Sequence, residues 1–207
     1  MTFEQLAMLL RSLQEPVKTL ATTVAMTGLR IGKVLALGWA NADLEKNLVR
    51  VPEAVYMGHF STPKTKSSIR DVPLGPALRQ SLLDYRNGEP EGALVFASRN
   101  GKPLDAKNIL RRILKPTCAR LELPAITWHS FRHTHATLLS DLGESMKTAQ
   151  AQLGHARLST TAEIYTHVVP ASQRDAVAKL ENAIWTQVDS NGLKLQRVVV
   201  KGSSLIQ

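Results

Sequence analysis

The chain has 207 residues, 43% of them hydrophobic, which is enough to bury a core within one domain. Its 26 Lys and Arg residues against 17 Asp and Glu give a net charge of +9, and this excess favours a polyanionic partner, most often nucleic acid. No stretch approaches the length of a membrane span, the N-terminus lacks the pattern of a secretory signal, and the single cysteine, Cys118, excludes an intrachain disulfide. These features predict a cytoplasmic protein with no membrane partner.

The first half of the chain alternates helix signals with short strand signals. The capping-box pattern Thr2-Phe-Glu-Gln5 predicts a helix to about Ser12, and Pro16 suits the first turn of a second helix that ends at Thr27-Gly28. The basic stretch 63–68 is predicted to form a turn between two strands. The other elements predicted here are a short helix at 29–37, strands at 48–51, 54–57 and 69–74, and a helix at 76–86.

The second half reads as mainly helical. A capping-box match, Thr160-x-x-Glu163, marks the start of one helix, while Gly143 and Gly154 stand where helices end. The elements predicted here are a short strand at 93–97 and helices at 105–121, 130–142, 145–153, 160–168 and 172–185.

The composition changes after residue 186. Gly192 breaks the helical pattern, and residues 196–201 read as an isolated strand that needs a partner. The sequence thus predicts a mostly α protein with a small antiparallel β-sheet (an α+β fold). Its expected organisation is one domain at 1–186 and a C-terminal tail at 187–207 that either folds back on its own domain or is exchanged between protomers.

Residues 127–167 hold the densest group of chemically capable side chains. His129 and Arg132 are three residues apart and share the N-terminal turn of one helix, with Ser130 as the expected N-cap, so the positive end of the helix dipole reinforces the guanidinium as an anion site. His155 follows the helix-ending Gly154. Tyr165 comes ten residues later on a helix whose other face can be buried, which leaves the phenol free.

Other histidines and tyrosines in the sequence are assigned to packing. His135 falls on an apolar helix stripe and is expected to be a hydrogen-bonded core residue, and Tyr56 and Tyr85 are expected to pack. The segment from His129 to His133 has the spacing of a zinc-protease helix, but Ser130 replaces the required glutamate and no third ligand lies nearby. We therefore expect neither a metal nor a cofactor.

The order His129-x-x-Arg132, Leu-Gly-His155, then Tyr165 resembles the active-site pattern of the tyrosine recombinases of phage-integrase type. Far upstream, Thr-Gly-Leu-Arg30-Ile-Gly resembles the first arginine motif of the same family. The resemblance runs from about residue 2 to 180 and implies the catalytic-domain fold of that family. One departure is Lys33, which stands where family members commonly carry an acidic residue.

The resemblance also implies roles for six residues in a metal-independent reaction that breaks and rejoins DNA strands through a 3′-phosphotyrosyl intermediate. Tyr165 is the nucleophile, His129 the proton acceptor and a hairpin lysine the general acid. That lysine is placed at Lys64, with Lys66 as the alternative, and Arg70 is expected to contact phosphate or cap the hairpin. The groups expected to neutralise the phosphate are Arg30, Arg132 and His155.

The partners implied by the resemblance are double-stranded DNA and further copies of the chain, as a tetramer on DNA and a monomer without it. Family members usually carry an N-terminal DNA-binding domain before the catalytic domain, so this chain is either an excised fragment or a reduced protein. The resemblance is to the integrases of phages and integrative elements in particular, which implies that the chain acts for such an element. Two alternatives stay open, namely DNA relaxation as in a type IB topoisomerase and an inactive DNA-binding relic of an integrase.

Overall fold

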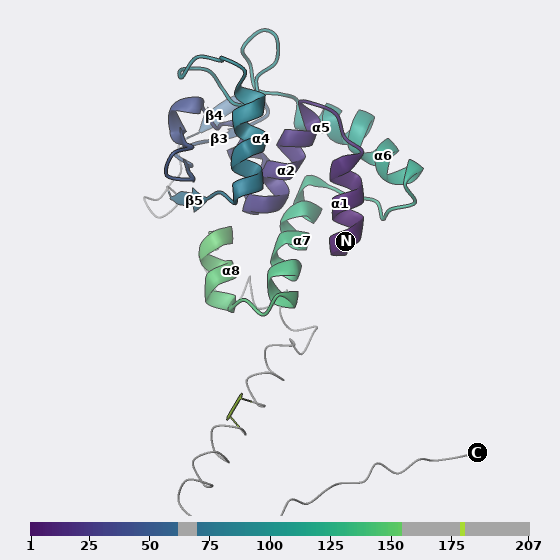
Figure 1. Ribbon diagram of the computed structural model, residues 1–207. Helices are drawn as coiled ribbons and strands as arrows, with labels where there is room; N and C mark the ends of the chain where they lie inside the picture. The colour runs from purple at the N-terminus through teal and green to yellow at the C-terminus, as the bar shows by residue number, and fades with distance from the viewer. Residues whose placement is uncertain (62–69, 155–178, 181–207) are drawn as a thin grey trace, which may run out of the picture.

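Helix α2 (Val17–Thr27) lies at the centre of the computed structural model, which describes residues 1–61, 70–154 and 179–180 (Figure 1). Hydrophobic side chains cover nearly all sides of α2, so it forms the axis of the core. The elements packed on it are α1 (Phe3–Arg11), α3 (Ile31–Leu35), α4 (Pro76–Arg86) and α7 (Trp128–Asp141).

The buried face of α2 includes three threonines, which a buried helix tolerates only if their hydroxyls find acceptors. The Thr23 hydroxyl donates to the Thr19 carbonyl at 2.8 Å, and the Thr27 hydroxyl donates to the Thr23 carbonyl. The helix ends as expected at Gly28, whose φ of 62° is the left-handed conformation that glycine adopts most easily. This turn directs the chain into α3 and places Arg30 next to the end of α2.

A three-stranded antiparallel sheet in the order β1-β2-β5 packs beside the helices. Val49 pairs with Ala42 on one side and with Val72 on the other, and the valines are fully buried. The predicted fold class, mostly α with a small antiparallel sheet, is therefore confirmed. The strands are β1 (Ala42–Asp43), β2 (Leu48–Arg50) and β5 (Asp71–Pro73).

A separate two-stranded hairpin joins β3 (Ala54–Tyr56) to β4 (His59–Ser61), and β4 is a strand that was not predicted. Its turn contains Gly58 at a φ of 81°. Tyr56 was expected to pack, but its side chain, which lies next to this turn, is 76% exposed. The assignment of Tyr56 to packing is therefore wrong.

Two further elements differ from expectation. Residues 93–97 do not form a strand, since the segment only makes isolated bridges, Gly38 with Leu94 and Ala97 with Pro103. The helix expected at 105–121 is instead α5 (Ala106–Ile109), a π-helical stretch at Leu110–Leu114 and α6 (Lys115–Arg120). Pro116 accounts for the wider turn, because it lacks an amide hydrogen and its ring would collide with the Arg112 carbonyl in a regular α-helix.

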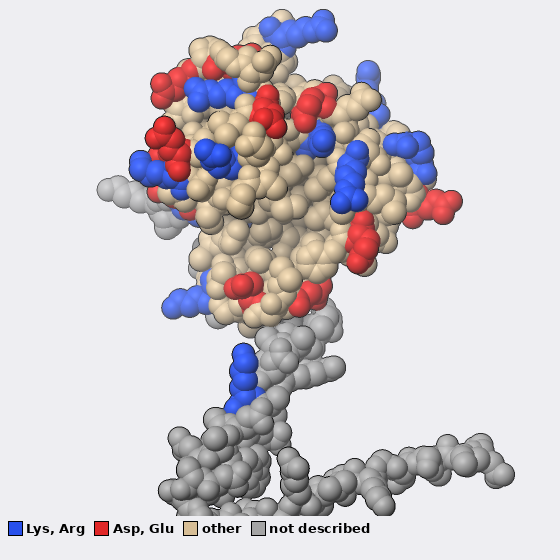
Figure 2. Space-filling model, in the orientation of Figure 1, with Lys and Arg blue, Asp and Glu red and all other residues tan. Residues whose placement is uncertain are grey.

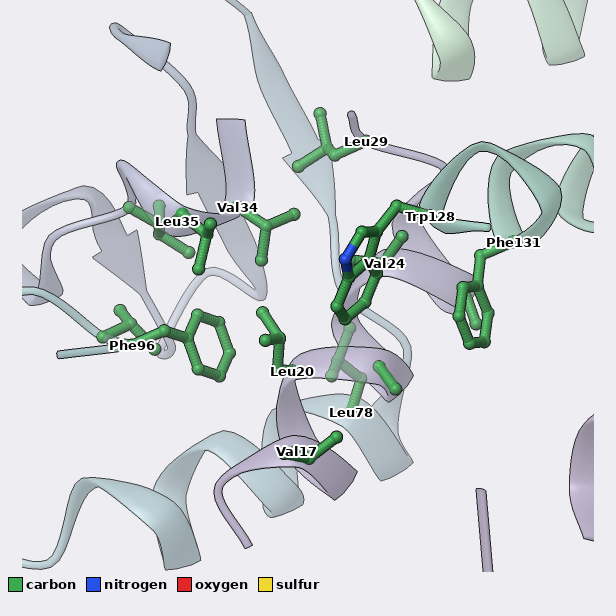
Figure 3. Packing of buried hydrophobic residues seen from close by; sticks show 14 of the residues in the cluster. Val17, Leu20, Val24, Leu29, Val34, Leu35, Leu78, Phe96, Trp128 and Phe131 are labelled. Carbon is green, nitrogen blue, oxygen red and sulfur yellow. The ribbon is translucent and has the colours of Figure 1, made fainter. Parts of the chain in front are cut away.

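Helix α7 completes the core against α2. Figure 3 shows Trp128 close to Val24 of α2, with Phe131 beside it at 5.8 Å between ring centroids. The Trp128 indole N–H donates to the Ala106 carbonyl at 2.8 Å, which fastens the start of α7 to α5. Helix α8 (Met146–Leu153) then packs along α7 (Figure 1). The predicted helix at 160–168 and the predicted tail at 187–207 lie outside the described residues.

Candidate active site

Helix α7 carries two of the candidate catalytic residues at its start. Its N-cap is Thr127 and not Ser130 as expected, because the Thr127 hydroxyl accepts from the Ser130 amide while the Ser130 hydroxyl accepts from the Thr127 amide. His129 falls in the first turn of α7 and its side chain is exposed. Arg132 falls one turn later and is only 3% exposed.

Arg132 connects three segments that are far apart in the sequence. One terminal nitrogen of its guanidinium donates to the Gly28 carbonyl, at the end of α2. The other donates to the Leu153 carbonyl, at the end of α8, at 2.8 Å. Carbonyls at helix C-termini carry partial negative charge, so both ends attract the cation. The chain therefore holds Arg132 between the segment that leads into Arg30 and the segment that leads into His155.

Arg30 lies on the exposed side of this junction. It is the N-cap residue of α3, with extended backbone angles, and its side chain is exposed. Burial, followed by the charges of the nearby Arg30 and Arg70, lowers the pKa of Arg132 to about 10. Arg132 stays protonated at neutral pH all the same. The structure thus brings the two predicted arginines together, while their catalytic roles stay a prediction.

Arg70 is a third guanidinium of the site. It precedes β5, and its terminal nitrogen donates to the Gln152 carbonyl of α8 at 3.0 Å. Gly154, in the left-handed conformation, leaves room for this guanidinium, because a Cβ there would collide with it. Burial and the charge of Arg30 both lower the pKa of Arg70. Arg70 was expected at the hairpin, but it also reaches α8, and no local pattern signals a contact across 82 residues.

Lys33 adds a fourth positive charge. It lies in α3 one turn after Arg30 and is half-buried. Burial, followed by the charges of Arg70, Arg30 and Arg132, lowers its pKa from 10.5 to about 8. The environment of Lys33 is thus unfavourable to its charge. Lys33 is unusual at this position in the sequence, but no local pattern predicts its nearness to these cations.

His135 behaves as the core histidine that its position predicted. Its Nδ1 lies 2.8 Å from the Ala25 carbonyl, and its ring packs against Gly28, where a Cβ would come within 2.7 Å of the ring. Burial is the main cause that lowers the pKa of His135. Because both the ring and Arg132 are held against the same turn at Gly28, His135 helps to shape the site from inside the core.

Three of the predicted site residues, Lys64, His155 and Tyr165, lie outside the described residues, as does the alternative Lys66.

Of the two tyrosines assigned to packing, Tyr85 does pack, with its ring stacked on Phe96 at 5.7 Å. Burial raises the pKa of the Tyr85 phenol, so it is a poor source of a nucleophilic phenolate. Tyr85 is therefore a structural residue.

Beyond the cation cluster of Arg30, Lys33, Arg70 and Arg132, the described residues indicate no second site. On the face shown in Figure 2, Lys and Arg side chains alternate with Asp and Glu around a largely uncharged centre. Among the residues that the structure describes, no three His, Cys, Asp or Glu side chains gather as a metal site. Within the same residues, no helix is both long and apolar enough to cross a bilayer.

Comparison with known proteins identifies related chains. Residues 1–171 match the model of the phage integrase family. The chain is 35% identical to a tyrosine recombinase XerC-like protein of Caldanaerobacter subterraneus, over 75% of this chain and 46% of that protein. It is 32% identical to the ICEBs1 integrase of Bacillus subtilis, over 81% of this chain and 49% of that protein. The chain therefore spans about half the length of the curated relatives it matches.

Solved structures share the fold. The Tn1549 transposon integrase in complex with transposon right end DNA superposes with a TM-score of 0.73 at 24% identity, over 87% of this chain and 65% of that chain. The XerA recombinase superposes with a TM-score of 0.69 at 22% identity, over 86% of this chain and 62% of that chain. The helices and the small sheet described above are thus arranged as in these proteins.

Proposed function

The chain belongs to the phage integrase family of tyrosine recombinases, and from this premise we propose that it is the catalytic domain of a site-specific DNA recombinase. In this proposal residues 1–186 cleave and rejoin DNA through a 3′-phosphotyrosyl intermediate, during integration or excision of a phage or integrative element. Family membership supports recombinase chemistry for this chain, and the proposal adds the complete reaction of cleavage and rejoining.

The observation that carries the proposal is the position of Arg132. Its two hydrogen bonds join the ends of α2 and α8, which lead directly into Arg30 and His155. The ends of α2 and α8, which the sequence separates widely, are thereby joined at one buried guanidinium of α7. Such an arrangement is what a phosphodiester needs, because the negative charge on its non-bridging oxygens grows in the transition state and has to be neutralised by preorganised donors.

The proposed chemistry assigns one task to each group. Tyr165 attacks the phosphorus, the bond to the 5′ oxygen breaks, and Lys64 supplies the proton that the leaving 5′ oxygen takes up. His129, exposed at the start of α7, accepts the proton of the tyrosine. The phosphotyrosyl bond conserves the energy of the broken bond, so attack by a 5′-hydroxyl from another strand reverses the step and completes strand exchange.

Double-stranded DNA is the proposed partner. The net charge of +9 favours a polyanion, and related integrases have been solved with DNA bound. We further propose a monomer that assembles as a tetramer on DNA, with residues 187–207 passed to a neighbouring protomer. Deletion of residues 188–207 is then expected to preserve cleavage of single sites while strand exchange falls. Equal recombination by the truncated chain would contradict this assignment of the tail.

The test of the function is a covalent trap. The full chain is incubated with a pool of duplexes that carry a nick beside varied phosphates, so that cleavage releases a short strand and leaves the protein attached to DNA. Tyr165→Phe is expected to abolish the adduct while DNA binding stays nearly unchanged. Tyr56→Phe, which removes an exposed tyrosine, is the matched control and should form the adduct normally.

The outcomes separate the alternatives. Adducts mapped to Tyr165 by mass spectrometry, with transfer of strands between two duplexes, support a recombinase. Relaxation of supercoiled DNA without such transfer indicates a topoisomerase. DNA binding with no adduct in any variant indicates an inactive relic, and an adduct that persists in Tyr165→Phe excludes this tyrosine as the nucleophile.

A further inference from the structure

The C-terminal end of helix α8 receives donors for its last four carbonyls. Such carbonyls have no partner within a regular helix and need donors from beyond it. The carbonyls of Gln150 and Ala151 accept from the Gly154 amide as the chain turns out of the helix. The next two carbonyls accept from the side chains of Arg70 and Arg132. Two arginines from distant segments thus bond consecutive carbonyls of one helix end.

Arg70 connects this helix end to the sheet. Its own carbonyl accepts from the amide of the buried Val51, directly after β2, at 3.1 Å. Its guanidinium donates to the Gln152 carbonyl of α8 at 3.0 Å. The Arg70 Nε–H is shielded from water and has no hydrogen-bond partner among the residues that the structure describes. The backbone of Arg70 is therefore fixed by the sheet, while its side chain reaches the end of α8.

Gly154 shows how closely the Arg70 guanidinium fits against α8. The residue is left-handed, with a φ of 63°, and a Cβ added to it would overlap a terminal nitrogen of Arg70. A side chain at position 154 therefore has to displace the guanidinium from the Gln152 carbonyl or open the turn. Gly154→Ala thus disturbs the contact of Arg70 without removing its charge.

Arg132 depends on the same helix end. Its buried guanidinium donates to the Leu153 carbonyl at 2.8 Å and also to the Gly28 carbonyl of α2. The Leu153 side chain packs against the same turn, since a Cβ at Gly28 would come within 2.8 Å of it. A shift of the end of α8 would move one of the two acceptors relative to the other. The direction of the Arg132 guanidinium therefore depends on what holds α8 in place.

We propose that Arg70 is a positioning residue of the candidate active site, which fixes the end of α8 and thereby the direction of the Arg132 guanidinium. Arg70 then acts through Arg132 and does not itself bind phosphate. The inference rests on the proposed recombinase function for the reaction that Arg132 serves. It differs from the two roles expected from the sequence, a contact to phosphate or a cap of the hairpin, because the guanidinium of Arg70 bonds to α8.

The first measurement uses the full chain without DNA. The Arg132 Nε–H is buried and has no hydrogen-bond partner in the described part of the chain, so burial alone protects it from exchange with water. Its NMR signal is assigned by its loss in Arg132→Lys. In Arg70→Met and in Gly154→Ala this signal should shift and exchange about tenfold faster, as expected when one hydrogen bond no longer holds the helix end.

Arg79→Met is the matched control. Like Arg70, Arg79 is half-buried and donates to a distant backbone carbonyl, that of Leu44, at 2.7 Å, but it does so from α4 and not at α8. Its replacement removes a charge and a hydrogen bond of the same kind. The Arg132 signal should stay that of the wild type in Arg79→Met, even if both methionine variants lose equal stability in urea unfolding.

The second measurement is the rate of covalent adduct formation, at saturating amounts of the nicked duplex that gives the wild type its highest yield. Arg70→Met and Gly154→Ala should each lower this rate about 10- to 100-fold, the range for a lost hydrogen bond from a charged donor. Arg79→Met should leave the rate unchanged. Because both substitutions at the site disturb one contact, the double variant should be no slower than Arg70→Met alone.

Two results overturn the inference. They are an Arg132 signal that is unchanged in Arg70→Met, and rate losses of Arg70→Met and Gly154→Ala that multiply in the double variant. If Arg70→Met does not fold, the same signal in Gly154→Ala, which keeps the arginine, decides.

The two proposals fail separately. A wild-type chain that forms no adduct rejects the recombinase function, while the NMR signal of the free protein still decides the role of Arg70. An adduct at Tyr165 together with an unchanged Arg132 signal keeps the function and rejects the positioning role.

Discussion

Replacement of Lys33 by methionine is expected to stabilise the protein at neutral pH, although it removes a charge from a polar site. A pKa that falls from 10.5 to about 8 corresponds to about 3 kcal/mol against the charged form. That figure is a ceiling, because Lys33 is half-buried and water screens part of the repulsion. We therefore expect Lys33→Met to gain about 1 to 2 kcal/mol in free energy of unfolding, or about 2 to 8 °C in Tm.

The pH dependence of this gain has a definite sign. The folded state holds Lys33 at a lower pKa than the unfolded state does, so between about pH 8 and 10.5 the unfolded chain binds more protons. Wild-type stability then rises with pH through this window, and the penalty on the charge, complete below about pH 8, is gone near 10.5. The advantage of Lys33→Met should shrink in parallel.

The assay is urea unfolding of both proteins at about pH 7 and about pH 10. Lys46→Met is the contrasting control, since the pKa of Lys46 is raised by its hydrogen bond to Asp43 and its loss should leave stability slightly lower. The reasoning is refuted if Lys33→Met is less stable than the wild type at neutral pH. It is also refuted if the difference between the two proteins is the same at both pH values.

Three further expectations concern the frame around the cluster. Gly154→Ala should cost more stability than Gly58→Ala. Both alanines are strained by about 1 kcal/mol at positive φ, but only the alanine at position 154 also collides with Arg70. Equal losses in thermal unfolding would exclude the collision. Burial lowers the pKa of His135, so its contribution to stability is present above pH 6.5 and is lost as pH falls through the folded pKa. Substitution of His135 by leucine should therefore reduce the loss of unfolding free energy below pH 6.5, as measured by denaturant titrations at several pH values. If the leucine variant loses stability with falling pH as steeply as the wild type does, His135 is not the cause. Thr127→Ala removes the α7 N-cap and should cost about 1 kcal/mol in urea unfolding, with no loss contradicting the capping role.

Local signals predicted those elements that depend on local interactions. The capping box at Thr2 and Gln5 starts α1 as expected, and Gly28 and Gly154 end α2 and α8 in left-handed conformations. Each of these features needs only residues a few positions apart, so the sequence carries it directly. The α7 cap was misplaced by three residues because Ser130 takes the N3 role that glutamate or glutamine usually fills.

Features that depend on distant contacts could not be read in this way. The segment 93–97 has the composition of a strand, but it finds only single partners at Gly38 and Pro103. The hydrogen bond from Arg70 to the Gln152 carbonyl joins residues that are 82 positions apart, and no local sequence pattern around either residue predicts it. Motif resemblance brought Arg30 and Arg132 into one hypothesis, whereas the membership of Arg70 and Lys33 in the same cluster became visible only when the folded chain placed them together.

Backbone carbonyls hold the guanidinium groups of Arg132 and Arg70 in the part of the chain that the structure describes. A carboxylate beside Arg132 would fix the guanidinium but would also neutralise it and compete with an incoming anion. The carbonyls of Gly28 and Leu153 fix it with partial charges only, and they belong to helix ends whose carbonyls lack partners within the helix. The fold thus converts two helix termini into a cradle that positions cations while their net charge is preserved. Part of the repulsion that remains is visible in the low pKa of Lys33.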